Sequence, residues 1–283
     1  MFGTLYIVAT PIGNLEDITL RALRILKEVD LIAAEDTRHT KTLLSTYNIR
    51  TSLTSYHDHN EKTKAHALVA RLKQGENVAL VSDAGTPTLS DPGFRLVQEA
   101  IQQGISVVPV PGPSALTAVL SVSGLPTDHF VFEGFLPPKK KERREKLSRL
   151  LEETRTLVFF EAPHRLKESL EDLLEILGDR EVTVGREVTK LYEEFLHGRL
   201  SELSARVESR EMRGEITLVV RGAEKDRDRD GDREDVLLVE IERLQKKGFR
   251  VKEIAEVLGE KFSCSKREIY RLVLGGAKSN IIP

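Results

Sequence analysis

Short apolar runs alternate with amphipathic segments over most of the chain, and this alternation constrains the fold more than any other feature. The runs nearest the start are almost continuously apolar and cover residues 4–9, 31–34, 78–81 and 105–110. Such runs are typical of strands that are buried on both faces of a parallel sheet. Between them, residues 18–29 and 92–103 carry apolar side chains at helical spacing. Strands that alternate with helices in this way predict an α/β fold.

A second region with the same character follows the first. Its predicted elements are strand 130–133, helix 140–153, strand 156–161, helix 163–177 and strands 182–186 and 215–220. At roughly 100–200 residues per domain, a chain of 283 residues has room for about two domains and a small third unit. The domains we expect are an N-terminal α/β domain over 1–120, a second α/β domain over 121–222, a charged linker over 223–235 and a helical unit over 236–283.

The segment after the second region alternates acidic and basic side chains and has no large apolar one. Because it cannot bury a hydrophobic face, we interpret it as an exposed linker, and Gly231 argues against a long helix there. Amphipathic helices are predicted beyond it over 236–245, 247–259 and 263–273.

The last two of these helices have matching apolar faces. Ile254 and Leu258 on one would pack against Ile269 and Val273 on the other. This pattern resembles a helix-turn-helix unit, which would present basic side chains to nucleic acid. The candidates for that contact are Lys266, Arg267 and Arg271. A small three-helix unit that binds protein is the alternative interpretation.

Composition excludes several classes of protein. The 43 Lys and Arg residues nearly balance 45 Asp and Glu residues, which excludes a globally basic nucleic-acid binder. The single cysteine, Cys264, excludes an intramolecular disulfide framework and a cysteine-rich metal site. His57 and His59 share a face only in a strand, so no metal site is predicted. Neither a secretory signal nor a membrane span is recognisable, and we expect a cytoplasmic protein without a membrane partner.

Loops of small residues and prolines follow the predicted strands of the first domain at 10–14, 82–87 and 111–115. Ligands bind at the carboxyl ends of strands in an open parallel sheet, and glycine or alanine lets a ligand approach the backbone. Asp83 would accept hydrogen bonds from an amine or a ribose hydroxyl, and Ser114 would cap the following helix. Any one loop alone is more simply an ordinary turn, but three at one sheet edge favour a binding site.

The sequence lacks both G-x-x-x-x-G-K-[ST] and G-x-G-x-x-G, which disfavours a P-loop nucleotide and a standard dinucleotide. Instead, the three loops and the segment Gly-Glu-Ile-Thr-Leu-Val-Val resemble the tetrapyrrole methylase superfamily of S-adenosylmethionine-dependent methyltransferases. Further segments are similar to the members that methylate the 2′ oxygen of a cytidine ribose in small-subunit (16S) ribosomal RNA. Those segments are residues 34–38, 56–61, 133–137, 159–165 and 185–190.

The resemblance spans residues 3–222 and has several implications. It implies two α/β domains with the cofactor in the cleft between them, a homodimer, and ribosomal RNA or the assembled small subunit as partner. It also implies the cofactor contacts by position. The residues expected to contact S-adenosylmethionine are Pro11, Ile12, Asp83, Thr86, Ser114, Ala115, Phe160 and Thr217.

Methyl transfer from a sulfonium to a ribose hydroxyl is mainly a positioning task, because the cofactor carries the activated group. The hydroxyl is a weak nucleophile, so a nearby base or cation would help by taking its proton or stabilising the developing alkoxide. Candidates at strand ends of the second domain are Glu161, His164, Glu187 and Lys190. A salt bridge or a helix cap is the competing interpretation for each, and the resemblance does not settle which residue is the base.

Clusters of basic side chains suggest where RNA phosphates would bind. The strongest run covers residues 139–149. The residues expected to contact RNA outside the C-terminal unit are Arg38, Lys41, Lys139, Lys140, Lys141, Arg143 and Arg144. A solvated helix face with pairs such as Glu142 and Lys146 is the alternative.

Two rival functions stay open on the sequence alone. The first is a methyltransferase acting on a carbon of a tetrapyrrole, although a small macrocycle needs neither the basic run nor the basic tail. The second is a nucleic-acid-binding regulator whose methylase-like body senses a small ligand. That regulator would bind DNA tightly through residues 236–283 and show no turnover.

Overall fold

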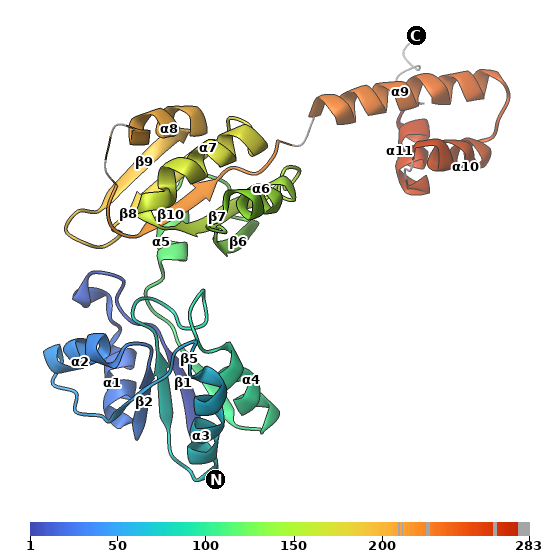
Figure 1. Ribbon diagram of the computed structural model, residues 1–283. Coiled ribbons are helices and arrows are strands. Elements are labelled where there is room, and N and C mark those ends of the chain that lie inside the picture. Colours follow the sequence, from blue (N-terminus) through green and yellow to red (C-terminus); the bar gives the residue numbers. More distant parts are fainter. Residues whose placement is uncertain (209, 211, 225–226, 263–264, 277–283) are drawn as a thin grey trace. The chain divides into compact units, whose positions relative to one another are not determined.

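The computed structural model describes residues 1–208, 210, 212–224, 227–262 and 265–276. The described chain divides into two compact units, Met1–Ala223 and Glu224–Pro283. The first unit contains two separate five-stranded sheets, and the second is helical (Figure 1). In the described part of the chain, no helix has the length and apolarity needed to cross a membrane.

The first sheet is entirely parallel and has the strand order β3-β2-β4-β1-β5. Its strands are β1 Thr4–Val8, β2 Leu31–Ala34, β3 Leu53–Ser55, β4 Val78–Val81 and β5 Ser106–Val110. Every residue of β2 and β4 is buried, because helices cover both faces. The predicted α/β class is therefore confirmed.

Two pairs of helices cover the first sheet. These helices are α1 Leu20–Glu28, α2 Thr37–Thr46, α3 Glu61–Lys73 and α4 Phe94–Gln102. Helices α1 and α2 lie on one side of the sheet and α3 and α4 on the other (Figure 1). Side chains of α1 and α2 share one core with the sheet, and those of α3 and α4 share another. The helices predicted at 18–29 and 92–103 correspond to α1 and α4, whereas α2 and α3 were not predicted.

The second sheet is mixed and has the strand order β6-β7-β10-β8-β9. Its strands are β6 Phe130–Phe135, β7 Thr156–Glu161, β8 Glu181–Arg186, β9 Glu194–Arg199 and β10 Ile216–Val220. Only β6 and β7 pair in parallel, and the last strand in sequence, β10, lies in the centre between β7 and β8.

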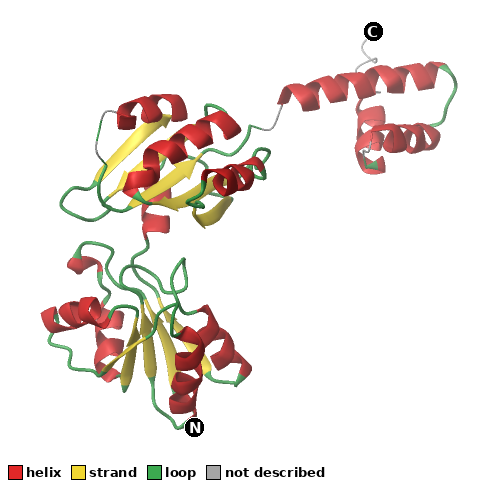
Figure 2. Cartoon of the chain, viewed as in Figure 1, coloured by secondary structure: helices red, strands yellow, loops and turns green. Residues whose placement is uncertain are grey.

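Helices also cover both faces of the second sheet (Figure 2). One face carries α6 Lys140–Ser148, α7 Leu166–Leu177 and α8 Leu200–Glu208. The other face packs against α5 Ala115–Val122, which directly follows the third loop of the first sheet. Gly185 of β8 is required at this contact, because a Cβ there would lie 2.6 Å from a methyl group of Val119.

The C-terminal unit consists of α9 Arg227–Lys246, α10 Val251–Phe262 and α11 Lys266–Gly276. The predicted packing of α10 on α11 is confirmed, since Ile254, Leu258, Ile269 and Val273 are all buried in one core. The interpretation of the charged segment was wrong in one respect. Helix α9 begins at Arg227 and runs through Gly231, so most of that segment is helical. Cys264 lies outside the described residues.

Candidate functional site

The three loops of small residues lie side by side, because β4, β1 and β5 are neighbours in the sheet. Hydrogen bonds join the loops to one another. Thr10 and Gly85 exchange two backbone hydrogen bonds of 2.9 and 3.0 Å, and the Thr86 hydroxyl donates to the Pro113 carbonyl at 3.3 Å. Gly85 has a φ of +81°, which favours glycine at this turn. The sequence prediction that these loops share one edge of the sheet is thus confirmed.

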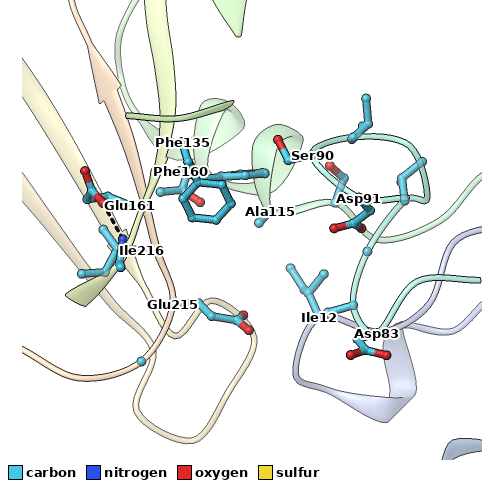
Figure 3. A pocket seen from close by; sticks show the side chains of 18 of the residues that line it. Ile12, Asp83, Ser90, Asp91, Ala115, Phe135, Phe160, Glu161, Glu215 and Ile216 are labelled. Atoms are coloured by element: carbon cyan, nitrogen blue, oxygen red, sulfur yellow. Dashed lines mark hydrogen bonds between the residues drawn. The ribbon is translucent and has the colours of Figure 1, made fainter. Parts of the chain in front are cut away.

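A cavity of about 420 Å³ opens at this edge and also receives residues of the second sheet (Figure 3). Its size is within the range of small-molecule sites, about 300–1,000 Å³. Seven of the eight expected cofactor contacts line this cavity, namely Ile12, Asp83, Thr86, Ser114, Ala115, Phe160 and Thr217. Pro11 lines a neighbouring hollow instead.

Aromatic side chains form one wall of the cavity. The ring of Phe160 lies 4.9 Å from that of Phe132 and 5.6 Å from that of Phe135, in edge-on and tilted arrangements. Figure 3 shows Phe160 and Phe135 across the cavity from Ile12 and Asp83. A flat apolar group would therefore find aromatic and aliphatic surface on this side.

Carboxylates form the opposite wall, where Glu35, Asp83 and Asp91 line the cavity. Burial, and then the charge of Asp83, raises the pKa of Glu35. Burial raises the pKa of Asp91 to about 6, although a hydrogen bond with Ser82 partly offsets this effect. Above pH 6 Asp91 is predominantly ionised, and a cationic ligand would be attracted to this group of carboxylates.

Two residues of the loop between β4 and α4 have unusual backbone conformations. Thr88 has a φ of +76° and Ser90 a φ of +66°, a region that non-glycine residues rarely adopt. Ser90 and Asp91 line the cavity next to these positions. Strain of this kind clusters at functional sites, which adds to the evidence that this loop belongs to one.

Ser114 lies at the expected position before α5, but its side chain does not make the predicted capping hydrogen bond. It is the N-cap residue of α5, with an extended φ of −154°, yet its side chain makes no capping hydrogen bond. The prediction of a side-chain cap was wrong. The first backbone N–H groups of α5 are consequently not bonded by this hydroxyl, and Ser114 and Ala115 both face the cavity.

Glu161 borders the cavity, and its carboxylate has partners within the protein. It accepts hydrogen bonds from the Ala162 backbone at 2.7 Å and the Ser169 hydroxyl at 2.6 Å, and it pairs with Arg165 at 2.7 Å. The side chain has no exposed surface. Through these contacts the carboxylate anchors the turn that follows β7, and the catalytic role of Glu161 stays a prediction. His164 is exposed and lines none of the three cavities that we describe.

Lys190, another catalytic candidate, lines a neighbouring hollow, and its ammonium contacts a residue of the cavity. Its Nζ lies 2.9 Å from Glu187 Oε1 and 3.1 Å from Glu215 Oε2, and Glu215 lines the cavity. Burial disfavours the ammonium, but the two carboxylates outweigh burial and raise the pKa of Lys190. Lys190 is therefore a cation at neutral pH, suited to stabilising negative charge rather than to removing a proton.

A second hollow of about 480 Å³ adjoins the first. The two hollows share Ile12, Asp83, Ala84 and Glu215, and Lys190 lines the second. The backbone is crowded here, since a Cβ on Gly13 would lie 2.3 Å from Lys190 Cγ. The loops of the two sheets thus meet at Lys190.

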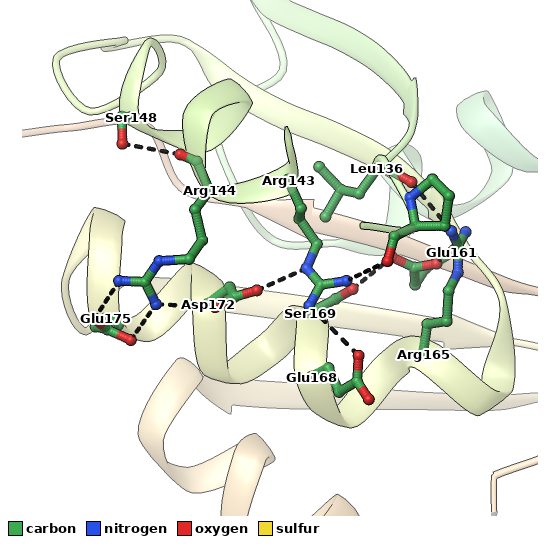
Figure 4. A network of polar contacts seen from close by, with 11 residues as sticks. Leu136, Arg143, Arg144, Ser148, Glu161, Arg165, Glu168, Ser169, Asp172 and Glu175 are labelled. Carbon is green, nitrogen blue, oxygen red and sulfur yellow. Dashed lines mark hydrogen bonds and ion pairs between the residues drawn. The ribbon is translucent and has the colours of Figure 1, made fainter. Parts of the chain in front are cut away.

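The basic run of α6 is largely engaged with the protein itself (Figure 4). Arg143 is 1% exposed and bonds Asp172 at 2.7 Å and Glu168 at 3.5 Å. Arg144 pairs with Asp172 at 3.1 Å and also with Glu175. The expectation that Arg143 contacts RNA was wrong, because its guanidinium is buried against α7.

The other predicted RNA contacts are accessible. Exposed positions are held by Arg38, Lys41, Lys139, Lys140, Lys141, Lys266, Arg267 and Arg271. Several of these side chains have acidic neighbours: Arg38 pairs with Asp36 at 2.8 Å, and Lys266 with Glu256 at 3.2 Å. Exposed pairs of this kind contribute little to stability.

Sequence reasoning missed several residues that line the cavity. Glu35, Asp91, Phe135 and Glu215 were not proposed as contacts, although all four line it. A signal was available for Glu35, because it directly follows β2, the strand beside β4. Phe135 lies in the segment 133–137 that carries the family resemblance, but its place at the cavity depends on the packing of β6 against β7.

Comparison with protein families gives a match to tetrapyrrole (corrin/porphyrin) methylases over residues 4–204. A relative from Halalkalibacterium halodurans, named ribosomal RNA small subunit methyltransferase I, is 49% identical over 95% of this chain and 94% of its own. A relative of the same name from Thermotoga maritima is 54% identical over 78% of this chain and 100% of its own.

Solved structures show the same fold at low identity. The uroporphyrin-III C-methyltransferase from Thermus thermophilus superposes with a TM-score of 0.53 and 22% identity, over 77% of this chain and 94% of that one. The likeness concerns the fold alone. These two comparisons cover 77% and 78% of this chain, which is close to the length of the first compact unit, Met1–Ala223.

Proposed function

The chain belongs to the ribosomal RNA small subunit methyltransferase I group of the tetrapyrrole methylase family, and from this premise we propose that it methylates small-subunit ribosomal RNA. The methyl donor is S-adenosylmethionine and the acceptor is the 2′ oxygen of a cytidine ribose. One observation carries the proposal: the three loops and the second sheet together line a single cavity with an anionic wall, next to a lysine.

The residues of the cavity fit S-adenosylmethionine. The carboxylates of the cavity, Asp83 among them, suit the ribose hydroxyls and the positive charges of the cofactor. The aromatic wall around Phe160 suits an adenine ring. The N–H groups at the start of α5, beside Ala115, suit a carboxylate. We propose that residues 1–120 supply most of this site and that residues 121–222 complete it.

When bound, the cofactor would supply an activated methyl group on a sulfonium. The protein has to hold the acceptor oxygen in line with that methyl group and respond to the charge change at the oxygen. Lys190 Nζ would stabilise the negative charge that grows on the oxygen as its proton leaves. Glu215 Oε2, 3.1 Å from that nitrogen, is the carboxylate placed to accept the proton.

Transfer of labelled methyl groups tests this function directly. We expect the protein to move tritiated methyl from S-adenosylmethionine onto purified small ribosomal subunits that lack the modification. Nuclease digestion and nucleoside analysis should then give labelled 2′-O-methylcytidine. Cofactor binding without transfer to subunits or free ribosomal RNA would contradict the proposal, and transfer to a porphyrin would establish the tetrapyrrole alternative.

We propose further that the C-terminal unit, with α9, α10 and α11, binds RNA through Lys266, Arg267 and Arg271. All three side chains are exposed on or next to α11. The relative from Thermotoga maritima matches only 78% of this chain with its whole length, which supports an accessory role for the remainder.

Removing residues 224–283 should therefore leave cofactor affinity within about twofold of the full chain and weaken binding to the small subunit by about tenfold or more, because three phosphate contacts would be lost. Calorimetry with S-adenosylmethionine and filter binding of subunits would measure the two effects. An equal loss of both affinities would contradict the accessory role.

The ribosomal substrate would require a cytoplasmic enzyme, and the family resemblance supports a homodimer. Neither property enters the chemistry proposed above, which needs only residues of one chain.

A further inference from the structure

Helix α2 has a hollow on each of its two sides. The hollow that adjoins the cofactor cavity is called the inner hollow, and the other is called the outer hollow. The helix contributes to the inner hollow the side chains of His39, Thr42, Leu43 and Thr46. It contributes to the outer hollow the side chains of Thr37, Arg38, Lys41, Leu44 and Ser45. Helix α2 therefore forms a ridge between the two.

The inner hollow, of about 480 Å³, has a wall that hydrogen bonds fix in place. The wall is the loop from Pro11 to Leu15. At its end the Tyr47 hydroxyl donates to the Leu15 carbonyl at 2.6 Å and the Asn14 backbone donates to the Thr189 hydroxyl at 3.0 Å, and just before its start the Thr10 backbone donates to the Gly85 carbonyl at 2.9 Å. Pre-formed walls of this kind are characteristic of ligand pockets.

The lining of the inner hollow combines apolar surface with polar groups. Leu15 is 44% exposed and Pro11 lies beside it, so that a flat ring would have aliphatic surface to cover. His39 and Thr42 face the same space from the helix. The inner hollow meets the cofactor cavity at Glu215, next to the Lys190 ammonium.

The outer hollow, of about 860 Å³, has a different chemical character. Its lining includes three cations, Arg38, Lys41 and Arg50, together with several hydroxyl groups and no carboxylate. A further cation lies close by, since Lys64 Nζ donates to the Thr54 hydroxyl at 2.9 Å. Asp36, which does not line the hollow, pairs with the 90% exposed Arg38. A lining of cations and hydroxyls suits phosphate groups.

We propose that the inner hollow receives the target nucleoside and that the outer hollow binds phosphates of the neighbouring nucleotides, with the RNA strand crossing α2. This inference rests on the proposed function and adds the path of the substrate. The base enters between Leu15 and the face of α2 that carries Thr42. The ribose then lies where the two cavities join, beside Lys190 and Glu215.

The geometry also specifies the state of the RNA. A base in the inner hollow cannot remain stacked in a helix, because the walls of the hollow occupy the positions of its neighbours. Proteins that act on such nucleotides take them from single-stranded or unpaired segments. The substrate class is therefore an unstacked pyrimidine nucleotide with phosphates on at least one side.

Filling the inner hollow tests the first half of the proposal. Thr42→Phe places a ring in the hollow from an exposed helix position, and threonine and phenylalanine have similar helix propensities. Thr63→Phe is the matched control, on an exposed position of α3 that lines none of the three hollows. With small subunits that lack the modification, kcat/KM for Thr42→Phe should fall at least tenfold. The Kd for S-adenosylmethionine should stay within twofold, and Thr63→Phe should match the unaltered protein.

Removing cations tests the second half. The double variant Lys41→Ala with Arg50→Ala should bind subunits with a salt dependence whose slope, log Kd against log salt, is smaller by about one to two. Lys27→Ala, an exposed lysine of α1 that lines neither hollow, should leave that slope unchanged.

The outcomes separate this inference from the proposed function. If the unaltered protein forms 2′-O-methylcytidine while Thr42→Phe keeps its full kcat/KM, the nucleoside does not enter the inner hollow. An unchanged salt slope in the double variant would likewise overturn the role of the outer hollow. If the unaltered protein transfers no methyl group to any RNA, the proposed function itself fails.

Discussion

Replacing Arg143 by alanine should destabilise the protein by about 3–5 kcal/mol, the typical cost of breaking a buried ion pair from one side. The guanidinium is 1% exposed and lies 2.7 Å from an oxygen of Asp172, which is 3% exposed. Without Arg143, Asp172 would keep only its contact with Arg144, at 3.1 Å. The urea concentration at the midpoint of unfolding would measure the loss of stability, provided that the m value, the slope of unfolding free energy against urea concentration, is the same in both proteins.

A matched control is available on the same helix. Lys140 is exposed on α6, and Lys140→Ala should change stability by no more than about 0.5 kcal/mol. A double replacement, Arg143→Met with Asp172→Leu, should recover much of the loss, because apolar residues of similar volume often replace a buried pair without cost. If Arg143→Ala and Lys140→Ala were equally mild, the buried pair would not stabilise the second sheet and its helices.

Replacing Lys190 by methionine should lower kcat for methyl transfer by about 10²–10³-fold, the usual effect of removing one group that stabilises a developing oxyanion. Methionine keeps the apolar stem that packs against Gly13 but removes the charge next to Glu187 and Glu215. The Kd for S-adenosylmethionine should be nearly unchanged, because Lys190 does not line the cofactor cavity. Single-turnover kinetics on small subunits would give the rate.

A second variant, Lys190→Arg, distinguishes whether Lys190 acts as a cation or as a base. The two carboxylates raise the pKa of Lys190, so the ammonium persists through neutral pH. Arginine cannot act as a base but retains a positive charge, and Lys190→Arg should therefore keep a rate within about tenfold of the unaltered protein. A methionine variant with normal kcat would exclude Lys190 from the reaction. An arginine variant as slow as the methionine variant would favour proton removal by the amine.

The three loops that line the cavity were predictable because their evidence is local. A buried strand, then glycine, proline and small residues, specifies a turn at a strand end, and the order of strands decides which ends are neighbours. Phe160 and Thr217 came from the family resemblance, and the structure places both at the same cavity.

The features that the sequence did not predict have a different origin, because they depend on contacts that the local sequence does not show. Arg143 belongs to a basic run, and only the packing of α6 on α7 reveals that its partner is Asp172, 29 residues away. Helix α2 is rich in threonine and serine and has little intrinsic helix propensity. Its start depends on the Asp36 side chain, which accepts a hydrogen bond from the Arg38 backbone at 2.8 Å.

The position of β10 has a consequence for the order of events during synthesis. This strand is the last of its sheet to leave the ribosome, yet it belongs in the middle, between β7 and β8. Until residues 216–220 emerge, both neighbours present unpaired edges and their apolar faces lack a central partner. The first sheet is complete by Val110 and can form early, whereas the second cannot close before the chain reaches Val220. A nascent chain stalled just before that point would carry one finished sheet and one open sheet prone to aggregation.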